Sequence, residues 1–158
     1  MPRSRCSVCN ASGGETFWFL RRSFIFDVDR AREITRDGRK PRLLNRDDVR
    51  YAVDSSRIRR SHVPHVETRF PGIIARVRYY AESGKIVRGD VLIDGHHRAA
   101  RCLELGRPFS AYLLSYDETD QVLTRRPDAT RRQKRLRTRG PQARPKQPRT
   151  ARAAPRSR

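Results

Sequence analysis

The residues of this chain that are best suited to chemistry stand together in the stretch Asp94-Gly95-His96-His97-Arg98. Three apolar residues, Val91 to Ile93, precede the stretch and predict the end of a buried strand. Residues 96–105 have helical composition, and Gly106 follows them. The first N–H groups of a helix have no partner within it and carry the positive end of its dipole. A strand, a glycine turn and a helix N-terminus with an arginine therefore predict a site for phosphate or carboxylate.

Each residue of the turn has a candidate role in such a site. Glycine lets a ligand approach the backbone closely, and arginine adds a charge-assisted contact to an anion. The phosphate-binding candidates are Gly95, His96 and Arg98. The candidate catalytic residues are Asp94 and His97, which would act as general base or orient the acceptor. The alternative is structural: Asp94 caps the helix, Gly95 only turns the chain, and Arg98 is solvated.

The other two histidines of the chain lie in a second short cluster, within residues 61–69. A proline in this segment excludes regular helix. Because every histidine belongs to one of two clusters, we expect this loop to face the turn at Gly95. Metal binding by the histidines is an alternative, but we expect hydrogen bonding or proton transfer near a polar ligand, and no fixed metal site. The secondary site candidates, all from this loop, are His62, His65, Glu67 and Arg69.

A small α+β fold with a mixed sheet is expected to position these residues. The predicted strands are Phe17–Leu20, Phe24–Val28, Ile73–Tyr80, Ile86–Asp94 and Phe109–Ser115. The predicted helices are residues 29–34, one that Asn45 opens, residues 96–105, and one from Ser115 to about Arg126, where Ser115 and Glu118 have capping-box spacing. We expect Trp18 to be a core residue, the alternative being a platform on which bases stack.

The positive charge of the chain is high and uneven. The formal net charge is +20, and residues 125–158 hold 14 Lys/Arg and one acid. The basic residues are 33 arginines and 4 lysines, a bias that a GC-rich genome produces by itself. Such a chain nevertheless attracts nucleic acid by neutralising phosphates. Because residues 127–158 have almost nothing to bury, they are predicted to be a disordered tail.

Three cysteines are too few for a disulfide scaffold. Cys6 and Cys9 have the spacing of half a zinc site, but no second pair exists, so residues 1–15 are predicted to be a flexible head. Cys102 is expected to be a small buried hydrophobic residue. With no apolar run long enough for a membrane span and no pattern of a signal peptide, the sequence predicts a cytoplasmic protein.

Residues 94–98, the alanines after them, Leu105-Gly106 and the strand from Phe109 resemble the ParB/sulfiredoxin superfamily over about residues 50–115. The resemblance implies one compact α+β domain, residues 16–126, that uses the Gly-x-x-Arg turn for nucleotide phosphates. Members of the superfamily bind CTP, ATP or ADP. Position by position, Gly95 matches the turn glycine and Arg98 the phosphate-binding arginine.

The chain also departs from this superfamily in ways that narrow its chemistry. His97 matches the histidine of the sulfiredoxin motif, but His96 stands where sulfiredoxins have their catalytic cysteine, so sulfiredoxin chemistry is not expected. The two histidines replace the arginine-rich motif of chromosome-partitioning proteins. No helix-turn-helix pattern follows the domain, so we do not expect a partitioning protein in the full sense.

Two functions follow as expectations. The first is a nucleotide- or phosphate-binding domain, with phosphotransfer or nucleotide hydrolysis as its chemistry if it is an enzyme, and with magnesium to neutralise phosphate charge. The second is a non-catalytic protein that binds DNA or RNA through the basic tail, residues 127–158. A regulatory or toxin-system module that kept the fold without the chemistry is a third alternative.

Overall fold

The computed structural model describes residues 14–81 and 83–126. The chain divides into two compact units, Met1–Pro127 and Asp128–Arg158, and all helices and strands described below belong to the first. The predicted head with Cys6 and Cys9 and the predicted tail from residue 127 lie outside the described residues, so both stay predictions. Within the described residues the fold is α+β, as expected, with four helices and two small sheets.

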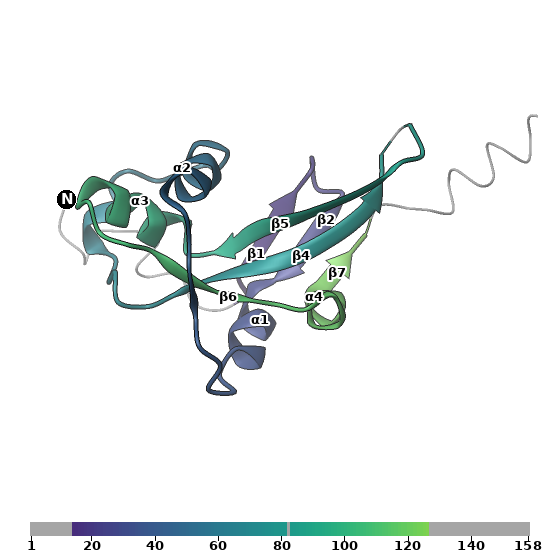
Figure 1. Cartoon of the computed structure of the whole chain (residues 1–158), viewed down its shortest axis with the longest axis horizontal. Helices are drawn as coiled ribbons and strands as arrows, with labels where there is room; N and C mark the ends of the chain where they lie inside the picture. The colour runs from purple at the N-terminus through teal and green to yellow at the C-terminus, as the bar shows by residue number, and fades with distance from the viewer. Residues whose placement is uncertain (1–13, 82, 127–158) are drawn as a thin grey trace, which may run out of the picture. The chain divides into compact units, whose positions relative to one another are not determined.

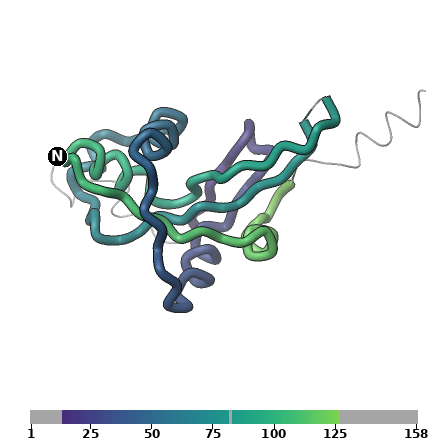
Figure 2. The backbone as a smooth tube through the Cα atoms, in the orientation of Figure 1, coloured from purple at the N-terminus to yellow at the C-terminus, as the bar shows by residue number. Residues whose placement is uncertain are grey.

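The first sheet is antiparallel and has the strand order β1-β2-β7. Its strands are β1 (Thr16–Phe19), β2 (Phe24–Asp27) and β7 (Leu123–Arg125). The second sheet has the order β3-β6-β4-β5, and its β4–β6 pair is parallel. Its strands are β3 (Arg42–Leu43), β6 (Ser110–Leu113), β4 (Gly72–Tyr80) and β5 (Ile86–Asp94). The long β4–β5 hairpin runs through the unit, and the other helices and strands lie on either side of it (Figures 1 and 2).

Three of the four helices begin at a residue whose side chain caps them, and the third helix along the chain begins at a glycine. The helices are α1 (Val28–Ile34), α2 (Arg46–Asp54), α3 (His96–Glu104) and α4 (Tyr116–Val122). Asn45 caps α2, and the predicted capping box of Ser115 and Glu118 is present at α4. A single 3-10 turn, η2 (Val63–His65), contains the proline of the histidine loop.

The β4–β5 hairpin separates two hydrophobic clusters. Alternation along β4 turns Ile73, Ala75 and Val77 toward β1, β2 and α4, where Phe24 and Phe26 complete the first cluster. The opposite face meets α2, α3 and η2 in the second cluster, which includes the buried Cys102, as predicted. Figure 1 shows α2 and α3 side by side, away from the β1–β2–β7 sheet. The strand end before Asp94 is thus buried on both faces, and the turn follows it directly.

Three expectations about the fold were wrong. The helix that starts at Tyr116 ends at Val122, not near Arg126, because Leu123 pairs with Phe26 and begins the short strand β7. The strands form two sheets instead of one, since β1, β2 and β7 do not join the β4–β5 hairpin. Trp18 is not a core residue, because its side chain lies on the solvent face of β1 and is 48% exposed.

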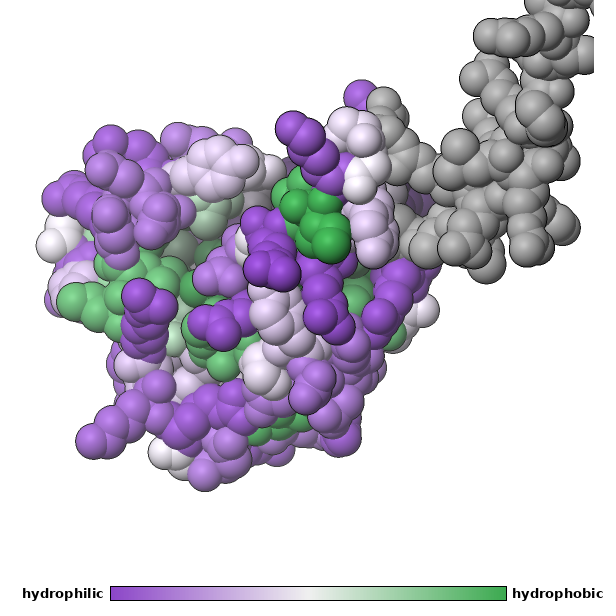
Figure 3. Space-filling model, turned by 45° about the vertical axis from the view of Figure 1, so that its right-hand side comes forward, coloured by the Kyte–Doolittle hydropathy of each residue, from purple (hydrophilic) through white to green (hydrophobic). Residues whose placement is uncertain are grey.

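The surface is mostly hydrophilic, with apolar patches between the charged side chains (Figure 3). Large hydrophobic residues that remain exposed include Trp18, Tyr51, Tyr80 and Ile86. Over residues 14–81 and 83–126, no helix combines the length and the apolar character that crossing a bilayer requires.

Candidate anion site at the N-terminus of helix α3

Gly95 makes the turn between β5 and α3 in a backbone conformation that favours glycine. Its φ is +99°, and it is the N-cap residue of α3. A Cβ at this position would lie 2.9 Å from the Cα of Gly72 and 3.2 Å from Nη2 of Arg98. No side chain caps the helix here. In place of a cap, the first N–H groups of α3 and the Arg98 guanidinium lie around one buried glycine.

Gly95→Ala is expected to lower the free energy of unfolding by about 2 kcal/mol, because it adds a backbone clash to an unfavourable φ. Urea unfolding measures the loss. Gly106→Ala is the matched control: its φ is +64°, but a Cβ there meets nothing within 4 Å. It should cost only about 1 kcal/mol, from the backbone conformation alone. Equal losses in the two variants would contradict a close approach at Gly95.

Asp94 is buried and holds two arginines. Its carboxylate accepts a bidentate pair of hydrogen bonds from Arg32 of α1, at 2.9 Å from Nε and 3.0 Å from Nη2. Nη2 of Arg98 lies 3.0 Å from Oδ2 of the same carboxylate. Asp94 is therefore not the cap of α3, as the structural alternative had it, but the centre of an Arg–Asp–Arg cluster.

The environment of Asp94 keeps its carboxylate ionised. Burial by itself would raise the pKa of this carboxyl group, and it is the largest influence. The hydrogen bond from Arg32 and the charges of Arg98 and Arg32 together outweigh burial, and the pKa falls below its ordinary value. A proton bound here would have to displace two ion pairs, which works against the role of Asp94 as a general base.

Arg98 is mostly buried, not solvated, and is held in place beside the turn. Its side chain is 20% exposed. Nη2 contacts Asp94 and also donates to the carbonyl oxygen of Pro71 at 3.2 Å. Its Nε, in contrast, is buried with no hydrogen-bond partner. A buried N–H without a partner is costly, so the position of Arg98 leaves donor capacity unused next to the N-terminus of α3.

His96 packs inward from the first turn of α3. Its ring stacks on Phe17 of β1, with 4.9 Å between the ring centroids. Burial, opposed by the charge of Asp94, lowers the pKa of His96 to about 4. At neutral pH the imidazole is therefore uncharged, and it contributes a neutral ring instead of a positive charge to an anion site.

The histidine loop faces the turn, as expected. The ring of His62 meets the ring of His97 edge-on, with centroids 4.9 Å apart, and His65 lies 6.2 Å from His62. Nε2 of His97 accepts a hydrogen bond from the backbone N–H of Arg59 at 3.1 Å. Burial, followed by the nearby positive charges, lowers the pKa of His97. The ring is neutral, with Nε2 already engaged, and Nδ1 carries the proton.

The remaining secondary candidates contact each other at the surface. Nε of Arg69 lies 2.8 Å from the carboxylate of Glu67, and its guanidinium lies over the ring of Phe70. Both side chains of this ion pair are exposed to solvent, so the structure places them on the loop without drawing them into the Arg–Asp–Arg cluster. Among the described residues, no group of three or more His, Cys, Asp or Glu side chains is arranged to hold a metal ion.

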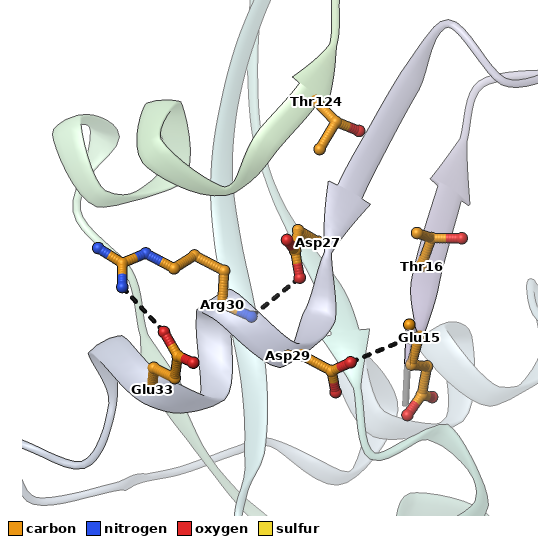
Figure 4. Close-up of a pocket in the computed structure, with 8 residues that line it drawn as sticks. Glu15, Thr16, Asp27, Asp29, Arg30, Glu33 and Thr124 are labelled. Atoms are coloured by element: carbon orange, nitrogen blue, oxygen red, sulfur yellow. Dashed lines mark hydrogen bonds and ion pairs between the residues drawn. The ribbon is translucent and has the colours of Figure 1, made fainter. Parts of the chain in front are cut away.

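One pocket among the described residues lies away from this turn. It has a volume of about 260 Å³ and lies between the start of β1, helix α1 and β7 (Figure 4). Four carboxylates line it, from Glu15, Asp27, Asp29 and Glu33. This negative lining does not suit phosphate, although Arg32 joins two of these carboxylates, Glu15 and Asp29, to Asp94.

Sequence reasoning missed two contributors to the turn, Arg32 and Phe17. Both come from elements more than sixty residues earlier, and no spacing pattern links them to Asp94 or His96. A signal for Arg32 did exist: an acid at the end of a buried strand needs a partner. With so many arginines in the chain, that signal could not select one of them.

Comparison of this chain with models of protein families, with curated proteins and with solved structures gives no match.

Proposed function

We propose that the turn from Asp94 to Arg98 binds the phosphate of a nucleotide, as the resemblance to the ParB/sulfiredoxin superfamily implies. The observation that carries the proposal is the position of Arg98. Its guanidinium is fixed by Asp94 beside the uncapped N-terminus of α3, and it retains an unpartnered Nε. A phosphate at the backbone N–H groups would meet the helix dipole and a charged donor together.

The charge of Arg98 supports an anion at the turn. Arg32 is already paired with Glu15 and Asp29 as well as with Asp94, and the adjacent His96 is neutral. Asp94 serves as a positioning residue, since it holds the guanidinium of Arg98 at the turn.

The proposal is one of binding. The two general-base candidates, Asp94 and His97, both have partners that compete with proton transfer. The magnesium expected for phosphate chemistry would enter with the nucleotide and neutralise its phosphate charge.

Isothermal titration of the full chain with CTP, ATP, ADP and GTP, with and without magnesium, tests the proposal. We expect at least one nucleotide to bind, and Arg98→Ala to weaken its binding by about tenfold or more, because a charge-assisted contact to phosphate is lost. Arg101→Ala removes the same charge one turn further along α3, where Arg101 is paired with Glu104, and should bind like the wild type.

Circular dichroism of each variant establishes that it is folded. Two results would reject the proposal: no nucleotide binds to the wild-type chain, or a folded Arg98→Ala variant binds as tightly as the wild type. Arg98→Lys separates charge from geometry, because lysine keeps the charge but cannot reproduce the planar guanidinium.

A further inference from the structure

The solvent side of the β1-β2-β7 sheet presents an exposed aromatic residue that has no role in the proposed site at Gly95. Alternation along β1 packs Phe17 and Phe19 against the core and leaves Trp18 on the outer face. Trp18 is the only tryptophan of the chain. Its side chain is 48% exposed. A strand with two aromatic residues packed inward has therefore placed its largest ring in solvent.

The surroundings of this ring are basic. The Arg22 guanidinium lies over the indole, with 3.8 Å from its Cζ to the ring centroid. Ile25 is the direct cross-strand neighbour of Trp18, and Arg125 is the neighbour of Ile25 on β7. Trp18, Ile25 and the exposed Arg125 thus form one row across the three strands. Arg21 lies in the turn between β1 and β2.

The turn that presents these arginines has an unusual backbone. Leu20, Arg21 and Arg22 have φ values of 47°, 50° and 68°. This left-handed region is unfavourable for residues with a Cβ, and none of the three is glycine. Backbone strain of this kind persists only where the surrounding structure holds it, and it concentrates at functional sites.

We propose that this face binds single-stranded nucleic acid, with a base stacked on Trp18 and the flanking phosphates neutralised by Arg21, Arg22 and Arg125. A guanidinium and a base stack on an indole in the same planar way, so a base can take the place of Arg22 while Arg22 turns to a phosphate. In a duplex the bases stack on each other, so their faces are not free for Trp18.

Charge complementarity favours a polyanion over other partners. Arg21, Arg22 and Arg125 are all exposed. The carboxylates of the cavity in Figure 4 lie at the other end of β1, next to Thr16, and they repel phosphate. The bound nucleic acid is therefore expected at the end of the sheet near Trp18. An acidic peptide would satisfy the arginines, but it has no flat ring in every unit to match the indole.

The single tryptophan makes the test direct. In the full chain, titration with oligothymidylate should quench the fluorescence of Trp18 to saturation, and the affinity should fall with rising salt. Measured with a labelled oligothymidylate, Trp18→Ala should weaken binding by about tenfold, the loss of one stacked base. Trp18→Phe should retain most of the affinity, and Tyr51→Ala, which removes an exposed ring on α2, should retain all of it.

The arginines have a matched control on α2. Arg21→Gln with Arg22→Gln should weaken binding and reduce the dependence on salt. Arg46→Gln with Arg50→Gln removes the same charge from exposed positions on α2 and should change the affinity less. Equal losses in the two pairs would mean that only net charge matters, and would overturn the proposal.

Three further outcomes would overturn it. One is that oligothymidylate binds without quenching Trp18 and binds Trp18→Ala as tightly as the wild type. Binding would then come from the positive charge elsewhere in the chain. Another is tighter binding of a duplex of the same length. The third is equal quenching by heparin or by an acidic peptide. If Trp18→Ala loses its fold, the quenching of the wild-type chain still decides.

Discussion

Asp94→Ala is expected to lower the free energy of unfolding by about 3 kcal/mol, the largest effect of any single substitution at the turn. The substitution leaves Arg32 and Arg98 converging on one mostly buried position without the carboxylate that holds them. Removing one partner of a buried ion pair costs more than the pair contributes, because Arg98 stays mostly buried without a carboxylate, whereas Arg32 keeps Glu15 and Asp29. Urea unfolding at neutral pH measures the effect.

Glu15→Gln is the matched control for this prediction. Glu15 also pairs with Arg32, at 2.7 Å, but its side chain is 56% exposed. An exposed ion pair contributes little, so this variant should lose less than about 1 kcal/mol. A double-mutant cycle of Asp94→Ala and Arg32→Ala should give a coupling energy of about 2 kcal/mol. An Asp94→Ala variant as stable as the wild type would contradict a structural role for this carboxylate.

The local part of the fold follows from short sequence patterns. Alternation identifies β1, β2, β4 and β5, and the capping residues Asn45 and Ser115 mark where α2 and α4 begin. Gly95 and Gly106 bound α3 on both sides in positive φ, as turn and C-terminal glycines do. Each of these signals lies within the element that it defines.

The remaining part depends on contacts between distant segments. β7 has only three residues and continues directly from α4, so nothing in its own pattern separates it from the helix. It forms because Leu123 pairs with Phe26, a residue almost one hundred positions earlier in the chain. The exposure of Trp18 depends in the same way on which face of β1 meets the β4–β5 hairpin, and aromatic residues occupy three of its four positions.

The candidate site shows the same division. The turn, its glycine and its arginine were predicted from five consecutive residues, and the pairing of the two histidine clusters was predicted from their grouping. That Asp94 is a positioning residue for two arginines could not be predicted, because the second arginine comes from α1. A buried carboxylate indicates that it needs a cationic partner, but it does not indicate which residue of the chain is that partner.

His96 should make the stability of the fold depend strongly on pH. The unfolded chain binds a proton at the ordinary histidine pKa of 6.5, whereas burial against Phe17 lowers the folded pKa to about 4. The contribution of the neutral ring is complete above pH 6.5 and is lost as the pH falls toward 4, because only the unfolded chain gains the proton. A difference of this size corresponds to about 3 kcal/mol of lost stability.

Two measurements separate His96 from the other groups. The pKa of the Asp94 carboxyl lies below its ordinary value, so its contribution is lost only below about pH 4, outside the window of His96. The pKa of His97 is also lowered, so His97 adds to the pH dependence in the same window and in the same direction. Unfolding free energies of the full chain between pH 7 and pH 4.5 should fall steeply for the wild type and less steeply for His96→Phe, in which the contribution of His97 remains. Nuclear magnetic resonance of the His96 ring protons gives the folded titration directly, and a midpoint near 6.5 would contradict the prediction.

Phe17→Ala provides the mechanistic control, because it keeps the histidine and removes the ring that covers it. Water admitted to His96 would stabilise the imidazolium and raise the folded pKa toward 6.5, so the pH dependence should shrink although the titrating group is still present. A positive charge at His96 would also lie in the first turn of α3, against the helix dipole but beside the proposed phosphate position. Nucleotide affinity in Phe17→Ala should therefore increase as the pH falls from 7 to 5, while in the wild type His96 stays neutral over that range and contributes no such increase.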